Sequence, residues 1–183
     1  MDQLEKKPGS NRLIKIIAPI LIMIVIAGIF IVKNNQEKAT IDSKGAGVTD
    51  HADFALEATA IDLEQLKSHG LPIIIDFGAD SCIPCKEMAP VLKELNKELQ
   101  GKVIVKFVDV WKNQEAAANF PVEVIPTQFF FDKDGNPFVP KDPKAMQMRM
   151  YSTRDTNKHV YTAHQGGMTK DQIMAVLKEM GVK

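Results

Sequence analysis

The stretch LPIIIDFGADSCIPCKEMAPVLKELNKEL, residues 71–99, decides the fold of this 183-residue chain. Its first part, residues 71–77, is apolar at nearly every position, which is typical of a parallel strand covered on both faces. Its last part, residues 85–99, predicts an amphipathic helix. The apolar side chains there recur at helical spacing: Met88, Val91, Leu92 and Leu95. Between the strand and the helix stand Cys82 and Cys85, which are the only cysteines of the chain.

Two cysteines separated by two residues predict redox chemistry in this setting. Thiol–disulfide exchange needs an attacking thiolate and a second thiol that resolves the mixed disulfide, and the spacing of Cys82 and Cys85 supplies both. A structural disulfide or half of a zinc site are the alternatives. A zinc site needs four ligands, and the sequence has no second CxxC and no paired histidines. We therefore expect a redox-active pair, with no metal and no cofactor.

Two segments carry a resemblance to a known family. Residues 76–90, DFGADSCIPCKEMAP, resemble the active-site strand, loop and helix of thioredoxins, and residues 124–131, VIPTQFFF, resemble that family's cis-proline loop and the following strand. The resemblance covers roughly residues 54–181 and excludes the first fifty. It implies an α/β fold of the thioredoxin-like type, a mixed β-sheet flanked by helices.

Three residues are the candidate catalytic groups. Cys82 stands at the N-terminal end of a helix, where the backbone dipole favours a thiolate, so we expect it to be the nucleophile. Cys85 lies one turn further on and is expected to resolve the mixed disulfide. Asp76 is an acid in an apolar strand, where burial raises a carboxyl pKa and allows proton exchange with a thiol. In thioredoxins the matching Asp assists the buried cysteine; the alternative is a strand-end residue that faces solvent.

The resemblance also assigns a substrate-binding set, which consists of Ile83, Pro84, Ile125, Pro126 and Thr127. Pro126 matches the cis-proline that faces the disulfide, and the residue before it offers backbone hydrogen bonds to a bound chain. The alternative is a trans proline that opens a strand. Pro84 and Ile125 resemble the reducing branch of the family, and no His stands between the cysteines, so we predict a reductant.

The chain departs from the family pattern at two positions beside the first cysteine. Ser81 replaces a Trp, and Gly78 replaces an aromatic residue, which opens the surface around Cys82. The single tryptophan, Trp111, is interpreted as a packing residue and not as a substitute for the missing one.

The rest of the domain is predicted from apolar periodicity and turn residues. Expected strands are 54–60, 71–77, 103–110, 127–131 and 159–163, and expected helices are 61–69, 85–99, 114–120 and 169–180. Asp62 is placed to cap the start of the expected helix 61–69. A hairpin turn is expected at 132–135.

Residues 137–158 form an insertion before the last strand, of a length that is usually functional or disordered. The alternation of Met146, Met148 and Met150 places the three on one strand face. We interpret them as a contact surface or core, with Cu(I) binding as the alternative.

The N-terminal region predicts a membrane anchor. Residues 16–32 carry no charge, and with residues 13–15 they are long enough to span a bilayer. Lys6, Lys7, Arg12 and Lys15 precede the apolar run, which favours a cytoplasmic N-terminus. A cleaved signal peptide is the alternative, but no small-x-small site follows. The expected organisation is a tail (1–12), an anchor (13–32), a linker (33–53) and a thioredoxin-like domain (54–183).

These observations predict a single-pass protein of the cell membrane with an extracytoplasmic thiol–disulfide oxidoreductase domain. Its expected partners are disulfide-bearing proteins, of which apocytochrome c is one candidate, and a membrane electron donor of the thiol-transporter type. Positive and negative residues are equal in number, 23 each, and the positive ones are dispersed, so nucleic acid is not expected. The alternatives are a disulfide oxidase or isomerase of the same fold, and a non-catalytic module that binds partners through the insertion.

Overall fold

The computed structural model describes residues 52–183 of the protein. The expected tail, the anchor and nearly all of the linker lie outside the described residues. Within residues 52–183, no helix is long and apolar enough to cross a membrane. Asp53, at the end of the expected linker, already contacts the domain, because its Oδ2 lies 2.8 Å from Nε2 of His69.

A five-stranded mixed sheet forms the centre of the described part, in the order β2-β1-β3-β5-β4. The strands are β1 (Ile73–Gly78), β2 (Ile104–Asp109), β3 (Thr127–Phe131), β4 (Met148–Ser152) and β5 (His159–Gln165). Strands β1 and β2 are parallel, and every other neighbouring pair is antiparallel. The mixed sheet predicted from the sequence is therefore confirmed.

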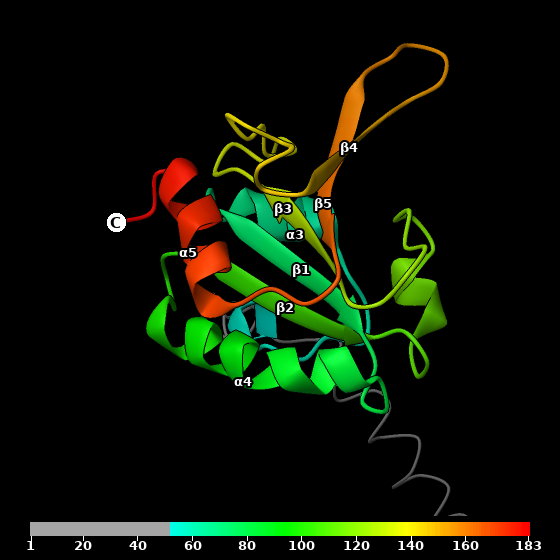
Figure 1. The fold of residues 1–183 in the computed structure, drawn as a ribbon, viewed down its shortest axis with the longest axis vertical. Coiled ribbons are helices and arrows are strands. Elements are labelled where there is room, and N and C mark those ends of the chain that lie inside the picture. Colours follow the sequence, from blue (N-terminus) through cyan, green and yellow to red (C-terminus); the bar gives the residue numbers. More distant parts are fainter. Residues whose placement is uncertain (1–51) are drawn as a thin grey trace, which may run out of the picture. The chain divides into compact units, whose positions relative to one another are not determined.

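Helices cover both faces of this sheet (Figure 1). They are α3 (Leu63–Ser68), α4 (Ile83–Glu98) and α5 (Lys170–Glu179), with the short 3₁₀ helix η1 (Gln114–Ala117). Helices α4 and α5 pack on one face, and α3 and η1 contribute to the core of the other. Asp62 caps α3 as predicted, since its side chain accepts a hydrogen bond from the Gln65 N–H at 3.0 Å.

Alternation along the strands divides the core into two layers. Ile74 of β1 and Phe130 of β3 point to the face covered by α4 and α5, where they meet Leu92 and Leu177. Phe77 and Phe129 point to the opposite face. The active-site residues described below belong to the first of these faces, or to the loops at its edge.

The predicted strand at residues 54–60 is wrong. Residues 52–54 form a helical turn, and only Glu57 makes a bridge, to Phe107 of β2. Nζ of Lys106 donates to the carbonyl oxygens of Ala52 and Ala55, at 2.7 and 2.8 Å. A buried ammonium must satisfy its donors, and binding these two carbonyls curls the segment into a turn.

The insertion at residues 137–158 forms ordered structure. Phe138 is buried in the core, and β4 pairs with β5 as an additional edge strand. The loop between β4 and β5 projects away from the sheet (Figure 1). Met148 and Met150 share one face of β4, as predicted, with Met148 buried and Met150 exposed. Met146 lies in the turn before β4, so it is not part of this strand face.

Candidate active site

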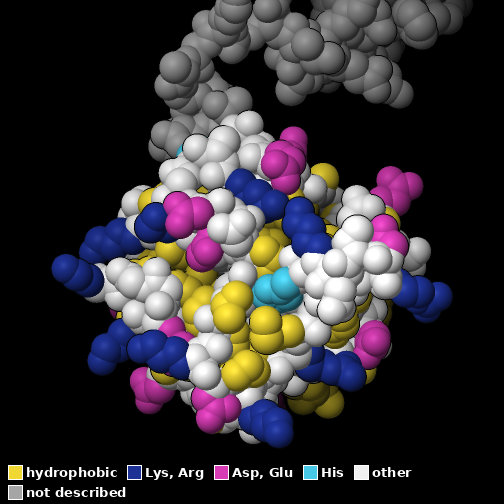
Figure 2. Space-filling view, turned by 90° about the horizontal axis from the view of Figure 1, so that it is seen from above, with side chains coloured by type: hydrophobic (Ala, Val, Ile, Leu, Met, Phe, Trp, Pro, Cys, Tyr) yellow, Lys and Arg dark blue, Asp and Glu magenta, His cyan; other side chains and the backbone are white. Residues whose placement is uncertain are grey.

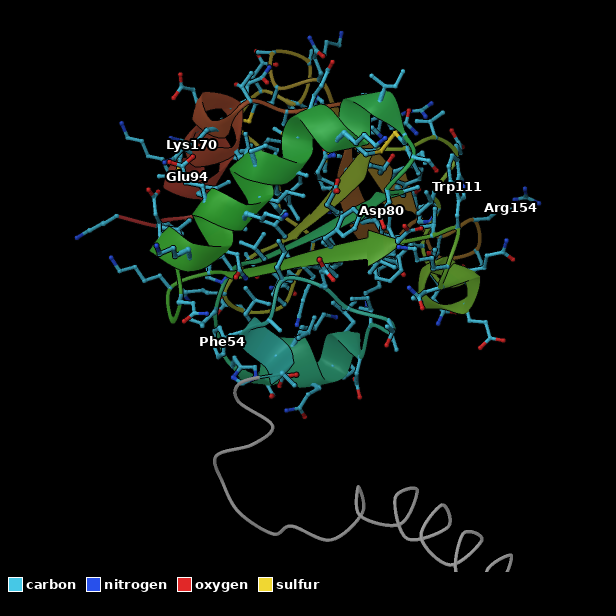
Figure 3. All side chains as sticks on the ribbon, turned by 90° about the horizontal axis from the view of Figure 1, so that it is seen from below. Phe54, Asp80, Glu94, Trp111, Arg154 and Lys170 are labelled. Carbon is cyan, nitrogen blue, oxygen red and sulfur yellow. A yellow bond between two sulfur atoms is a disulfide. The ribbon has the colours of Figure 1, made fainter. Side chains whose placement is uncertain are left out.

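Cys82 and Cys85 form a disulfide at the N-terminal end of α4, on the same side of the domain as Asp80 and Trp111 (Figure 3). Cys82 is the N-cap residue, and its sulfur accepts a hydrogen bond from the Cys85 N–H at 3.3 Å. The first turn of α4 carries no acidic side chain. Free amides and the helix dipole therefore favour negative charge on the Cys82 sulfur.

The two cysteines differ in accessibility. Cys82 is half-buried, whereas the Cys85 side chain is only 4% exposed and belongs to the buried face of α4. The residues between them, Ile83 and Pro84, are exposed. An incoming disulfide can reach the first sulfur of the pair and not the second.

A loop that precedes β3 faces the disulfide. The Ile125–Pro126 peptide bond is cis, as predicted, and the carbonyl oxygen of Ile125 lies 4.0 Å from the Cys82 sulfur. The Gly166 N–H donates to the Pro126 carbonyl at 2.8 Å, and the Thr127 hydroxyl donates to the Val124 carbonyl at 2.7 Å. Thr127 is fully buried, so its side chain supports the loop and is not accessible to a substrate, which corrects the expectation for this residue.

Asp76 is buried beneath the disulfide and is 1% exposed, so the alternative of a solvent-facing carboxylate is wrong. Burial raises its pKa to about 7, although a hydrogen bond from Gln128 opposes the shift. Nε2 of Gln128 donates to Oδ1 at 2.7 Å, and Oδ2 has no hydrogen-bond partner. Such a carboxyl group can exchange a proton near neutral pH.

The missing side chain at Gly78 leaves space between this carboxyl group and the buried cysteine. A Cβ atom at Gly78 would lie 3.3 Å from the Cys85 sulfur, 3.4 Å from Oδ2 of Asp76 and 2.9 Å from a ring carbon of Phe107. The unpartnered oxygen and the Cys85 sulfur thus border the same small space. On the outer side of Cys85 lies a cavity of about 90 Å³ lined by Leu56, Leu92 and Phe107 among others, which is large enough for water.

The loop after β2 is fixed beside the active site by Asp109, which sequence reasoning did not identify. Its carboxylate accepts hydrogen bonds from the backbone N–H groups of Asp80 and Trp111, both at 3.0 Å, and of Lys112 at 3.2 Å. Burial acts to raise the pKa of Asp109, but these bonds hold it below its usual value. Trp111 is 59% exposed, so the interpretation as a packing residue is wrong.

Two further polar residues of the site were not predicted. Gln128 of β3 and His164 of β5 are buried on the same face as Asp76. Their signal in the sequence is weak, because each is one polar residue in a short apolar run. Among residues 52–183, no three His, Cys, Asp or Glu side chains are grouped so that they could hold a metal ion.

Comparison with known proteins gives consistent matches. The family model named Thioredoxin matches residues 57–152. Thioredoxin C-2 of Corynebacterium nephridii is 32% identical over 112 residues, which cover 61% of this chain and 97% of that protein. Thioredoxin 1 of Chlorobaculum tepidum is 44% identical over 68 residues, which cover 37% of this chain and 67% of that protein. A crystal structure of chloroplastic thioredoxin z matches with 23% identity and a TM-score of 0.45, over 69% of this chain and 96% of that one.

Proposed function

The chain belongs to the thioredoxin family of thiol–disulfide oxidoreductases, and we propose that it is a membrane-anchored reductant of disulfides in extracytoplasmic proteins. The observation that carries the proposal is the asymmetry of the cysteine pair. Cys82 is accessible at a helix N-terminus, and Cys85 is 4% exposed beside a carboxyl group with a raised pKa. One sulfur is suited to attack a substrate, and the other to complete the exchange within the protein.

The first step of the proposed reaction is attack by the Cys82 thiolate on one sulfur of the substrate disulfide. A bond forms between Cys82 and that sulfur, the substrate S–S bond breaks, and the second substrate sulfur leaves as a thiolate that takes up a proton. The N-terminal amides of α4 stabilise the Cys82 thiolate before the attack. The result is a mixed disulfide, with Cys85 still a thiol.

The second step is attack by Cys85 on the Cys82 sulfur. Asp76, in its ionised form, accepts the proton of the Cys85 thiol across the space left by Gly78. The Cys82–Cys85 disulfide forms, the mixed disulfide breaks, and the remaining substrate sulfur leaves and is protonated. Two electrons and two protons pass from the protein to the substrate over the cycle.

Substrate proteins are proposed to dock on the apolar rim around Cys82. Ile83, Trp111 and Val124 are 71%, 59% and 50% exposed, so they leave apolar surface available to a partner. The backbone of Ile125, in the loop that faces the disulfide, is placed to pair with an extended substrate segment. On the face seen in Figure 2, basic and acidic side chains are interspersed around an apolar area, without the single-sign surface typical of nucleic-acid binding.

The direction of electron flow and the location are part of the same proposal. Pro84 before the second cysteine and the absence of His between the cysteines support a reductant. The uncharged run at residues 16–32 supports an anchor with the domain outside the cytoplasm. Since that side of the membrane is oxidising, the disulfide needs a membrane electron donor of the thiol-transporter type to be reduced again. Apocytochrome c, whose haem-attachment cysteines must be reduced, is one proposed substrate.

The experiment that tests the proposal is the reduction potential of the full chain in detergent, equilibrated with thiol buffers. A reductant is expected to lie within about −220 to −320 mV, and a value near about −120 mV would make the protein a disulfide-forming oxidant. A Cys85→Ser variant is expected to accumulate mixed disulfides with its substrates, and a Cys82→Ser variant, as the matched control, to form none. Equal trapping by both variants would contradict the assigned roles.

A further inference from the structure

Three buried polar side chains form a row across the sheet, from β1 through β3 to β5. Asp76 is the register partner of Gln128, and Gln128 is the register partner of His164. All three are buried, on the face that packs against α4 and α5, where most of the other buried side chains are apolar. The row ends in apolar neighbours on both sides, because Phe107 of β2 is paired with Asp76 and Met148 of β4 with His164.

Two hydrogen bonds connect the three side chains, and in each of them the donor lies on the side away from Asp76. Nε2 of Gln128 donates to Oδ1 of Asp76 at 2.7 Å, and Oε1 of Gln128 lies 3.2 Å from Nδ1 of His164. An ionised carboxylate only accepts hydrogen bonds, so Gln128 must turn its NH₂ group toward Asp76. Its Oε1 then faces the imidazole, which must carry a proton on Nδ1. The tautomer of His164 and the orientation of the Gln128 amide are therefore coupled.

The two carboxyl oxygens of Asp76 have different surroundings. Oδ1 is held by Gln128, whereas Oδ2 has no partner and borders the space next to the Cys85 sulfur. We propose that Gln128 and His164 are positioning residues for the proton exchange between Asp76 and Cys85: His164 fixes the amide of Gln128, and Gln128 holds Oδ1 so that Oδ2 faces the thiol. This inference rests on the proposed function for its purpose, but its geometry is independent of the substrate.

The surroundings of Asp76 contain few other ionisable groups. From α4 it is faced by Cys85 and by Met88, whose sulfur also lies 3.4 Å from Nε2 of Gln128. β2 contributes the ring of Phe107, and β5 contributes His164 through Gln128. Glu57, Asp80, Lys86 and Lys93 line the cavity on the outer side of Cys85.

The protonation state of His164 is consistent with its hydrogen bond to Gln128. Burial lowers its pKa, while a hydrogen bond with the Gly166 backbone opposes the shift, and the imidazole is neutral at neutral pH. A neutral imidazole carries one proton, and the hydrogen bond to Gln128 requires this proton on Nδ1. The pair thus supplies a single donor to Asp76 without adding a charge to the core.

The test is a direct titration of Asp76 in the reduced full chain in detergent micelles, followed by the ¹³C signal of its carboxyl carbon. Gln128→Leu removes the donor that favours the carboxylate, so the pKa of Asp76 is expected to rise by about one unit. His164→Leu frees the amide to turn and is expected to raise the pKa by a smaller amount. His164→Asn keeps an N–H near the position of Nδ1 and is expected to restore the original titration.

A second readout is the pH dependence of mixed-disulfide resolution by Cys85, measured in single turnover. Its midpoint is expected to follow the shifted pKa of Asp76 in Gln128→Leu and His164→Leu. The control variant is Thr162→Val, which removes a buried hydroxyl of β5 whose hydrogen bonds go to the Phe138 carbonyl and to Nε2 of His159, and not to the row. It is expected to lower the free energy of unfolding and to leave both titrations unchanged.

The outcomes separate this inference from the proposed function. An unchanged Asp76 titration in folded Gln128→Leu and His164→Leu would overturn the positioning roles, whatever the enzyme reduces. If Gln128→Leu does not fold, His164→Leu with its Asn rescue decides alone. If the wild-type chain reduces no protein disulfide while both titrations move as expected, the positioning is correct and the proposed function fails.

Discussion

The two faces of the central sheet differ in composition at their centres, although the same strands supply both. The face toward α3 and η1 has an aromatic centre, with Phe77, Phe129 and Tyr161 in edge-to-face contact. Its buried polar side chains are Lys106, on the edge strand β2, and Thr127, at the start of β3. The face toward α4 carries the polar row of Asp76, Gln128 and His164 between its apolar residues. The face toward α3 contributes mainly to the free energy of unfolding. The face toward α4 contributes less, because it holds a buried carboxyl group beside a thiol.

The contrast follows from what burial does to each side chain. An apolar ring gains free energy when it leaves water, whereas a carboxylate loses it unless hydrogen bonds compensate. Asp76 has one bonded oxygen and one without a partner. The polar row is therefore expected to be a source of instability that is concentrated at the site of the chemistry.

The largest expected effect is on the apolar face. Phe129→Ala removes a fully buried ring that contacts Phe77, Phe120 and Tyr161 at centroid distances of 5.1 to 5.6 Å. The free energy of unfolding is expected to fall by about 3–5 kcal/mol, measured by urea denaturation and circular dichroism. The comparison variant is Gln128→Leu, one residue earlier and on the other face, with a smaller expected loss of about 1–3 kcal/mol, because Asp76 and His164 each lose a hydrogen-bond partner. Similar losses in both variants would contradict the contrast between the faces.

A change of opposite sign is expected for Asp76→Asn. The pKa of Asp76 is about 7 in the folded chain against 3.8 in the unfolded chain, so between these values the folded state binds more protons and stability falls as the pH rises. A shift of this size corresponds to at most about 4 kcal/mol above pH 7. Removing the charge is expected to increase the free energy of unfolding at pH 8, with the gain disappearing near pH 4. A gain that does not depend on pH would show that ionisation is not its cause.

The sequence predicted the parts of the site that are local in the chain. Periodicity and the CxxC spacing identified β1, α4 and the cysteine pair, and the family resemblance identified Asp76 and Pro126. Gln128 and His164 are 52 and 36 positions from their hydrogen-bond partners along the chain. Their roles depend on the register of three strands, which local patterns do not fix.

The wrong predictions have a similar origin. Residues 54–60 are predicted as an edge strand, but Nζ of Lys106, more than fifty positions away, donates hydrogen bonds to the carbonyl oxygens of Ala52 and Ala55. Trp111 is predicted to be a packing residue, whereas Asp109 fixes its backbone in a loop that leaves the side chain exposed. In the first case long-range hydrogen bonds override the local preference, and in the second a hydrogen bond within the loop sets the backbone.

A smaller effect on the free energy of unfolding is expected at Gly78, which lies beside Asp76 and Cys85. A Cβ atom added by Gly78→Ala would lie 2.9 Å from a ring carbon of Phe107, which must move. The expected loss is about 1–2 kcal/mol in the free energy of unfolding, together with slower resolution of the mixed disulfide. Gly167→Ala is the control, since its nearest contact would be the Pro84 carbonyl oxygen at an ordinary 3.9 Å. Equal rates of resolution in the two variants would show that the space beside Cys85 is not used.

The smallest expected effect is at the edge of the apolar face, in β4. Arg149 is paired with Ala163 of that face, but its side chain extends into solvent, where Nη1 lies 2.9 Å from Oε2 of Glu123 and 2.7 Å from Oε1 of Gln165. Exposed ion pairs of this kind contribute little, because water and salt screen them. Arg149→Ala is therefore expected to leave the midpoint of urea denaturation unchanged, at low and at high salt. Since Glu123 precedes the loop that faces the disulfide, the same variant should be assayed for the KM of a protein substrate. A lowered midpoint would mean that β4 is part of the stabilising core, and that the apolar face extends beyond β5.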